Sequence, residues 1–307
     1  PVLVVGWMYH ACLLAWLATR PAGRRTAPRG ERRARVAWLL RGSLHTTTGL
    51  PRSTRLIIRL LGLLTRLPRR LAPDVVAANS RTGIRHHDRS GYRGHPWVLL
   101  TNGVDDAEFH PDTSDRAEVR AELGIPADSF VVIYVARVHR QKDHPSLLDA
   151  MDVAARILTR TQAASPLELV LVGSGTETFG ATTSGSVRIH GLGARTDVAR
   201  LLRGADLAVS SSLTEGLPNG LLEALATGLP IVATDVGDSA EVVGRCGRIV
   251  PPGDGPALGA AIADLARLEP TRRTELGDAA RGRAQHRFGL DRARREYRAL
   301  WDPAARR

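Results

Sequence analysis

From Phe130 onward, short apolar and β-branched runs alternate regularly with stretches of helical character, and this alternation limits the choice of fold more than any other feature. Nearly continuous apolar strands separated by helices are typical of a parallel sheet covered by helices on both faces. We therefore predict a doubly wound α/β domain, whose ligands bind at the carboxyl ends of the strands. The predicted strands are 130–136, 167–173, 187–191, 206–211, 230–234 and 247–251.

Helix start signals agree with this pattern. Asp143 is a candidate cap for the helix that begins "HPSLLDAMD", and Thr196 for the helix "DVARLLRG", which Gly204 would close. Pro218 stands where the first turn of a helix tolerates proline, so a helix is expected from there to about Thr227.

The first part of the chain is less regular. Its opening run, "PVLVVGWMYHACLLAWLATR", has the length of a membrane span or of the apolar part of a signal peptide. Gly6, Tyr9 and His10 interrupt the run, which favours a buried strand, a short turn and a helix. Because the chain starts within a strand pattern, we expect it to be a fragment of a longer protein. Three further strands are expected, within "ERRARVAWLLRGSL" and at 73–80 and 97–105.

We place the domain boundary near Pro111. The expected organisation is a partial N-terminal Rossmann-like domain over 1–111, a second Rossmann-like domain over 112–288, and a C-terminal helix over 289–307 that packs back towards the first domain. Both domains are expected to be doubly wound α/β, with the N-terminal one incomplete.

Residues 52–67 are predicted to form a basic amphipathic helix. At 100° per residue, its arginines fall within an arc of roughly 60° and leave most of the opposite surface apolar; they are Arg52, Arg55, Arg59 and Arg66. Such a helix can dock on an anionic membrane. It can equally pack its apolar side on the core while the arginines form its solvated face, and the pattern favours this second interpretation.

The overall composition narrows the choice of partner. The net charge of +12 suits an anionic partner, although Lys142 is the only lysine and so marked a preference for arginine also arises from coding bias. Aromatic residues make up only 4% and no recognition motif occurs, so nucleic acid is not an expected partner. The two cysteines, Cys12 and Cys246, lie far apart, which favours a reduced, cytosolic setting.

Two cations follow the first strand of the regular half. Arg137 stands at the end of the strand 130–136, and Lys142 at the start of the next helix. Two cations beside helix amides form a site for an anion such as a diphosphate. An accidental surface position for Lys142 remains the alternative.

Two carboxylates, Glu215 and Glu223, follow the strand 206–211 in the stretch "SSLTEGLPNGLLEALATGLPIVATDVG". If a helix begins at Pro218, Glu215 precedes it and Glu223 lies about one and a half turns inside, so both face one groove at different depths. A carboxylate accepts hydrogen bonds from two hydroxyls, which matches the vicinal diols of a sugar and a ribose. Two unrelated helix glutamates, or a glycosidase pair, are the alternatives.

Several segments together resemble one known family. The sequence resembles the nucleotide-sugar glycosyltransferases of family four, which have the GT-B fold of two facing Rossmann-like domains. The resemblance extends over nearly the whole chain from about Trp7. Its strongest segments are "VARVHRQKDHPSLLDA", "LVLVGSG", "VRIHGLGARTDVARLLRGADLAV", "SSLTEGLPNGLLEALATGLPIVATDVGDSAEVV" and "GRIVPPGDGPAL", and weaker ones are "VAANSR", "TNGVDDAEFHP" and "RFGLDRARREYRALW".

The resemblance implies a position on the donor for each matched residue. Arg137 and Lys142 would meet the diphosphate, Glu215 the sugar hydroxyls and Glu223 the ribose. Further residues implied at the donor are Gly216, Leu217, Pro218 and Asn219 through backbone amides, and His190, Gly191 and Leu192 in a loop near the base. On the acceptor side the candidates are His10, Arg41, Ser43 and His45; related chains often carry a histidine where Gly42 stands.

The expected function is transfer of a sugar from a UDP- or GDP-type donor to a glycan or lipid-linked acceptor, with retention of configuration. The resemblance implies no metal and no other cofactor. It also implies that the first strand and its glycine-rich acceptor loop precede the sequence given. The alternatives are a non-catalytic nucleotide-sugar-binding module and a nucleotide-sugar isomerase of related fold. The expected setting is cell-envelope or exopolysaccharide assembly in the cytoplasm, with peripheral contact at the cytosolic membrane face left open.

Overall fold

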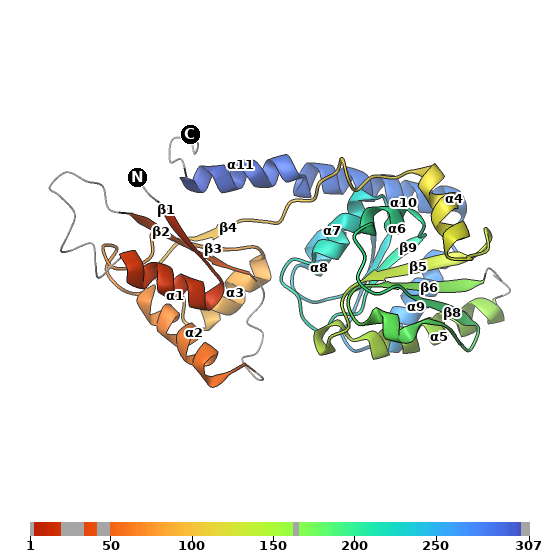
Figure 1. Cartoon of the computed structure of the whole chain (residues 1–307), viewed down its shortest axis with the longest axis horizontal. Coiled ribbons are helices and arrows are strands. Elements are labelled where there is room, and N and C mark those ends of the chain that lie inside the picture. Colours follow the sequence, from red (N-terminus) through yellow and green to blue (C-terminus); the bar gives the residue numbers. More distant parts are fainter. Residues whose placement is uncertain (1–2, 20–33, 42–49, 162–165, 302–307) are drawn as a thin grey trace. The chain divides into compact units, whose positions relative to one another are not determined.

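The computed structural model describes residues 3–19, 34–41, 50–161 and 166–301, and it divides the chain into two compact units. Unit 1 comprises residues 1–102 and 293–307, and unit 2 comprises residues 103–292. The chain therefore passes from unit 1 to unit 2 and returns at its C-terminal helix (Figure 1). Each unit has its own sheet and its own hydrophobic core.

Unit 1 contains a four-stranded parallel sheet in the order β1-β2-β3-β4. Its strands are β1 (Leu3–Trp7), β2 (Arg35–Leu40), β3 (Val75–Ala78) and β4 (Trp97–Leu99). β1 runs directly into the first helix, where Met8 adopts a φ of 63°. A Cβ at Gly6 would lie 2.5 Å from the backbone of Cys12, so this tight connection requires glycine.

Helices cover both faces of this sheet. α1 (Met8–Thr19) and α2 (Arg52–Leu64) pack side by side on one face, around the fully buried Trp38. On the other face, Leu300 of α11 (Leu290–Trp301) is buried against the strands, and the Arg35 guanidinium donates a 3.3 Å hydrogen bond to its carbonyl. The remaining helix, α3 (Arg81–Arg89), is capped by Ser80, whose hydroxyl accepts from the amide of Gly83.

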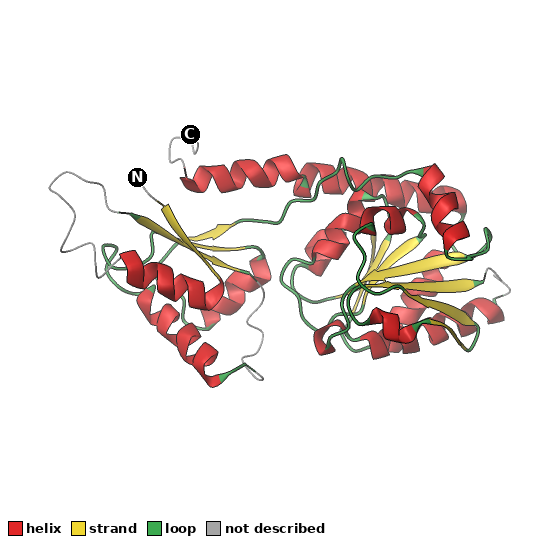
Figure 2. Cartoon of the chain, in the orientation of Figure 1, coloured by secondary structure: helices red, strands yellow, loops and turns green. Residues whose placement is uncertain are grey.

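Unit 2 contains a seven-stranded sheet in the order β11-β10-β9-β5-β6-β8-β7, in which only β7 is antiparallel (Figure 2). Chain order runs outward from β5 on one side through β6 and β8, and on the other side from β9 through β10 to β11. The strands are β5 (Phe130–Val135), β6 (Leu167–Val172), β7 (Ala181–Ser184), β8 (Val187–Gly191), β9 (Leu207–Ser210), β10 (Ile231–Thr234) and β11 (Gly247–Val250).

Two cores lie on the two faces of this sheet. One packs the strands against α5 (His144–Arg160) and α9 (Gly255–Ala266). The other packs them against α4 (Thr113–Glu122), α6 (Val198–Arg203), α7 (Asn219–Ala226), α8 (Ser239–Val243) and α10 (Pro270–Arg283). Helices on both faces of a mostly parallel sheet make unit 2 a doubly wound domain, as the alternation of strands and helices predicted.

Two details of the helix starts differ from the sequence expectations. The N-cap position of α6 is Asp197, so the prediction that Thr196 caps this helix was wrong. Pro218 takes the N-cap position of α7 and not its first helical position, because α7 begins at Asn219. The expected cap of α5 is confirmed, since the Asp143 carboxylate accepts from the amide of Ser146.

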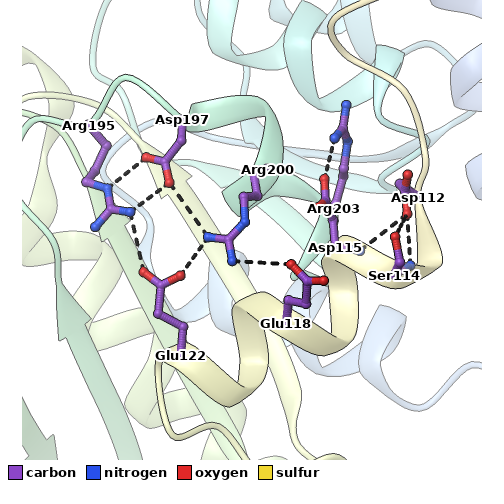
Figure 3. A network of polar contacts seen from close by, with 9 residues as sticks. All are labelled: Asp112, Ser114, Asp115, Glu118, Glu122, Arg195, Asp197, Arg200 and Arg203. Carbon is purple, nitrogen blue, oxygen red and sulfur yellow. Dashed lines mark hydrogen bonds and ion pairs between the residues drawn. The ribbon is translucent and has the colours of Figure 1, made fainter.

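A network of arginines and carboxylates ties α4 to α6 and to the loop before it (Figure 3). Arg200 lies 2.6 Å from Glu122 of α4, and Arg195 lies 2.7 Å from Asp197. The hydrogen bond from Arg200 lowers the pKa of the Glu122 carboxyl below its ordinary value. Pairs this exposed contribute about 1 kcal/mol or less each, so the network mainly fixes the position of the β8–α6 loop.

Among the described residues, no helix is long and apolar enough to cross a bilayer. The opening apolar run forms the strand and helix that its interruptions predicted, although no separate turn residue stands between β1 and α1.

Candidate functional site

A cavity of about 290 Å³ lies in unit 2 where the chain order of the sheet reverses. The successive connections from β5 and from β9 run in opposite directions, so the carboxyl ends of these two neighbouring strands flank an open crevice. The cavity lining comes from the ends of β5 and β9, from Lys142 and Glu215, and from the start of α7. It therefore occupies the position at which doubly wound sheets bind ligands.

The charged groups of this cavity form a pair. The ammonium group of Lys142 is hydrogen-bonded to Oε1 of Glu215, with the two side chains 27% and 13% exposed. The buried hydroxyl of Ser212 donates to the same oxygen at 2.8 Å. Oε2 of Glu215 has no hydrogen-bond partner within the described part of the chain, so it faces the site as an unused acceptor.

The backbone beside Lys142 is held by the loop after β9. The hydroxyl of Ser211 donates to the carbonyls of Lys142 and Asp143 at 2.8 and 3.0 Å, and the Tyr134 hydroxyl donates to the Lys142 carbonyl at 2.9 Å. Burial raises the pKa of Tyr134 to about 12, so the phenol remains a hydrogen-bond donor at neutral pH. Asp143 follows with a φ of 48°, which turns the chain into α5. The lysine is thus placed by the strand-end loop that also carries its glutamate partner.

Two glycines allow the loops of the site to approach one another. A Cβ at Gly237, which has a φ of +59°, would lie 2.4 Å from the carbonyl oxygen of Gly216 and 2.6 Å from that of Glu215. A Cβ at Gly173 would lie 2.5 Å from the backbone carbonyl carbon and oxygen of Ala136 and 2.6 Å from the amide of Arg137. The backbone carrying Glu215 and Arg137 therefore rests against two positions that accept only glycine without a shift.

The N-terminus of α7 opens into the same cavity. Pro218, Asn219 and Gly220 line it, and the side chain of Pro218 offers no acceptor that could cap the helix. A Cβ at Gly220 would lie 3.3 Å from the carbonyl of Val135, so the helix start lies close to the end of β5. Helix N-termini present amides and a partial positive charge, which favour anionic or hydroxyl-bearing ligands.

Five of the residues expected at the donor line this one cavity: Lys142, Glu215, Leu217, Pro218 and Asn219. Gly216 lies beside them, and its carbonyl accepts from the amide of Asp238 at 2.8 Å. Arg137 is exposed after β5 and has no hydrogen-bond or ion-pair partner within the described residues. It lies at the carboxyl edge of the sheet but outside the cavity lining.

Glu223 is half-buried in α7 and does not line the cavity. Burial, with a smaller contribution from Glu108, raises the pKa of its carboxyl. A buried carboxylate without a cation nearby is destabilised, which is typical of groups that await a ligand.

The expected position of His190 in a loop was wrong. His190 and Gly191 belong to β8, and the His190 ring is buried 2.7 Å from Oε2 of Glu168, on the neighbouring strand β6. The imidazole therefore neutralises a carboxylate inside the sheet. A Cβ at Gly191 would lie 2.1 Å from the carbonyl of Thr176, and Leu192, the first residue after the strand, packs against the core.

The acceptor-side candidates belong to unit 1. His10 is exposed on α1. Arg41 follows β2, hydrogen-bonds the Asn102 side chain and stands 5.2 Å from the centre of the Trp7 ring. Ser43 and His45 lie outside the described residues.

Sequence reasoning missed four residues that build the site: Tyr134, Gly173, Ser212 and Gly237. The two glycines carried a detectable signal, because each directly follows a predicted strand or its first loop residues. Nothing in the sequence distinguished Tyr134 and Ser212 from ordinary strand-end residues. No group of three or more His, Cys, Asp or Glu side chains suited to a metal ion occurs in the part of the chain that the structure describes.

Comparison with known proteins connects this geometry to a family. Residues 129–267 match the family described as glycosyl transferases group 1. The matched segment includes the whole cavity lining and every donor-side candidate.

Curated relatives agree with this assignment. TuaC of Bacillus subtilis, a glycosyltransferase named for teichuronic acid biosynthesis, is 30% identical over 165 residues, which cover 53% of this chain and 40% of TuaC. The MMP alpha-(1->4)-mannosyltransferase of Mycolicibacterium hassiacum is 31% identical over 213 residues, or 67% of this chain and 48% of that protein. The chain thus spans less than half the length of the curated relatives that it matches.

Solved structures agree on the fold. HepE of Anabaena, crystallised with UDP, superposes with a TM-score of 0.76 at 21% identity, covering 98% of this chain and 78% of HepE. The sucrose-phosphate synthase of Thermosynechococcus elongatus gives a TM-score of 0.74 at 20% identity, covering 97% and 72%. The predicted GT-B class of two parallel-sheet Rossmann-like units is confirmed, and the similarities together support a glycosyltransferase.

Proposed function

We propose that this chain transfers a sugar from a nucleotide-diphosphate sugar, of the UDP or GDP type, to a glycan or lipid-linked acceptor. The observation that carries the proposal is the Lys142–Glu215 pair beside the N-terminus of α7, in a cavity at the sheet's switch point. The group 1 family match over these residues supports it. HepE has also been crystallised with UDP-glucose. The name of TuaC supports a setting in cell-envelope or exopolysaccharide biosynthesis.

The proposed donor contacts follow from the chemistry of each group. Lys142, the exposed Arg137 and the first amides of α7 would bind the diphosphate. The unused Oε2 of Glu215 would accept hydrogen bonds from sugar hydroxyls, while Ser212 and Lys142 hold its other oxygen. Glu223 would accept from the ribose hydroxyls. The His190–Leu192 segment, with its ring bound to Glu168, would contribute near the base through its backbone alone.

In the reaction, the bond between the anomeric carbon and the diphosphate oxygen breaks, and its electron pair leaves with the nucleotide. The acceptor hydroxyl oxygen forms the new bond to the anomeric carbon and loses its proton. Negative charge develops on the diphosphate, where Lys142 and the helix amides stabilise it. Losing one such preorganised contact typically raises the barrier by about 2.7 to 4 kcal/mol. We propose retention of configuration, as expected of family four, with no metal requirement.

The test combines donor binding with turnover. A panel including UDP-glucose and GDP-mannose is screened by thermal shift, since a ligand that binds only the folded state raises the unfolding temperature. Release of nucleoside diphosphate is then measured with and without candidate glycan and lipid-linked acceptors, in the presence and absence of EDTA. We expect acceptor-dependent release that EDTA leaves unchanged.

Three variants test the site itself. Lys142→Ala and Glu215→Ala should abolish release, whereas Arg140→Ala, an exposed position two residues before Lys142, should retain it. Because the pair is partly exposed, its loss should lower stability by about 1 kcal/mol or less. Unchanged turnover in both site variants would contradict the assignment. Binding without turnover would favour a nucleotide-sugar-binding module, and acceptor-independent turnover an isomerase of related fold.

A further inference from the structure

The solvent face of α2 in unit 1 is more apolar than the core requires. Ile58, Leu61 and Leu64 are buried and already cover the sheet. Leu56, Leu60 and Leu63 nevertheless face solvent, with exposures of 67%, 39% and 57%. The neighbouring α1 also exposes two leucines, Leu14 and Leu17, on the same side of the sheet.

These leucines form a stripe bordered by arginines. At 100° per residue, Leu56, Leu60 and Leu63 fall within an arc of roughly 60°. Arg52, Arg55 and Arg59 are also exposed and occupy the adjacent arc of roughly 60°. The exposed half of α2 is thus divided lengthwise into an apolar and a basic strip. A helix whose arginines merely form its solvated face would not expose three leucines beside them.

The charge of the chain is concentrated in the same unit. Residues 1–102 and 293–307 contain 23 basic and 5 acidic residues, whereas residues 103–292 contain 20 basic and 26 acidic residues. Between Arg32 and Pro73 no acidic residue occurs at all. A coding preference for arginine would act on both units and would not remove acids from one of them. The asymmetry therefore points to an anionic partner of unit 1.

We propose that the exposed leucines and arginines of α1 and α2 form a surface that docks on an anionic phospholipid membrane. Leucine side chains would enter the boundary between head groups and acyl chains, and the arginines would contact lipid phosphates. With 13 residues, α2 is about 20 Å long and would lie in the plane of the interface. This proposal goes beyond the donor chemistry and places a lipid-linked acceptor within reach of unit 1.

Vesicle sedimentation of the full chain tests the surface. We expect binding to vesicles of equal parts phosphatidylcholine and phosphatidylglycerol, and none to pure phosphatidylcholine. Replacing Arg52, Arg55 and Arg59 by Gln should weaken binding about a hundredfold at low salt, since each arginine near an anionic surface contributes appreciably. Replacing Leu56, Leu60 and Leu63 by Ser should weaken it about tenfold or more, including at high salt.

The matched control replaces three exposed arginines of unit 2, Arg156, Arg160 and Arg245, by Gln, which changes the net charge equally. It should bind vesicles as the parent does. Leu56→Asn alone serves if the triple leucine variant does not fold. Absence of binding to anionic vesicles, or an equal loss in the unit 2 control, would overturn the proposal. So would a leucine variant that turns a dimer into a monomer while vesicle binding stays unchanged. Donor binding in the thermal-shift assay without lipid should be the same in all variants.

Discussion

Gly237 offers the sharpest test of how the site is built, because its side-chain hydrogen faces the backbone that carries Glu215. A Cβ there would stand 2.4 Å from the Gly216 carbonyl oxygen, and the residue holds a φ of +59°. Gly237→Ala thus adds two penalties. The left-handed conformation costs an alanine about 1 to 2 kcal/mol, and displacing the packed backbone costs about 1 to 3 kcal/mol more.

Gly124→Ala separates the two penalties. Gly124 has nearly the same φ, +64°, but a Cβ there would meet nothing within 4 Å. Any gain from restricting the unfolded chain is common to both variants and cancels in their difference. For a unit of 190 residues, 1 kcal/mol shifts the unfolding temperature by about 2 to 4 °C. We therefore expect decreases of about 2 to 8 °C for Gly124→Ala and about 4 to 20 °C for Gly237→Ala.

The assay is thermal unfolding by circular dichroism, followed by titration of the folded variants with UDP-glucose and GDP-mannose. Gly237→Ala should lose affinity for whichever donor binds the parent, because the Glu215–Gly216 backbone must move. Gly124→Ala should bind as the parent does. Equal unfolding temperatures and equal affinities for the two variants would refute the reasoning.

Three further outcomes are expected. Glu223→Gln should raise the unfolding temperature at neutral pH, because the raised carboxyl pKa means that stability is lost as pH rises from the ordinary glutamate range through that pKa; donor affinity should fall at the same time. Burial lowers the pKa of His87 to about 4, so unit 1 should lose up to about 3 kcal/mol of stability as pH falls from 6.5 to that value, seen in urea titrations by the fluorescence of the tryptophans, all five of which belong to unit 1. His87→Gln should flatten this dependence. Ser212→Ala removes a 2.8 Å hydrogen bond to the Glu215 carboxylate and should lower the free energy of unfolding by about 1.5 to 3 kcal/mol, measured by urea denaturation, and weaken donor binding.

The strands were predictable because apolar runs must alternate with helices wherever a parallel sheet is buried on both faces. The same reasoning brought Lys142 and Glu215 to one edge of the sheet, since the carboxyl ends of parallel strands lie together. Their direct pairing was not predictable. It depends on the left-handed turn at Asp143 and on the hydroxyls of Ser211 and Tyr134, which no periodic pattern encodes.

The position of His190 shows a second limit. Its strand was expected from the apolar pattern, but its partner Glu168 reads as one charge within another strand. Only the pairing of β6 with β8 brings the two side chains together. For α2, the sequence gave no measure of how wide an arc the core would cover, so the exposed leucines looked like core residues.

The return of the chain to unit 1 constrains the order in which the protein forms during synthesis. Tyr297 stacks on Trp7 and Leu300 is buried against β2 and β3, so the core of unit 1 is closed by residues that follow all of unit 2. At 5–20 residues per second, the 190 residues of unit 2 take about 10 to 40 s to translate. During that interval the apolar face formed by Ala37, Leu39, Val75 and Ala77 waits uncovered. Unit 2 can therefore finish folding first, and the segment most in need of a chaperone is the N-terminal sheet.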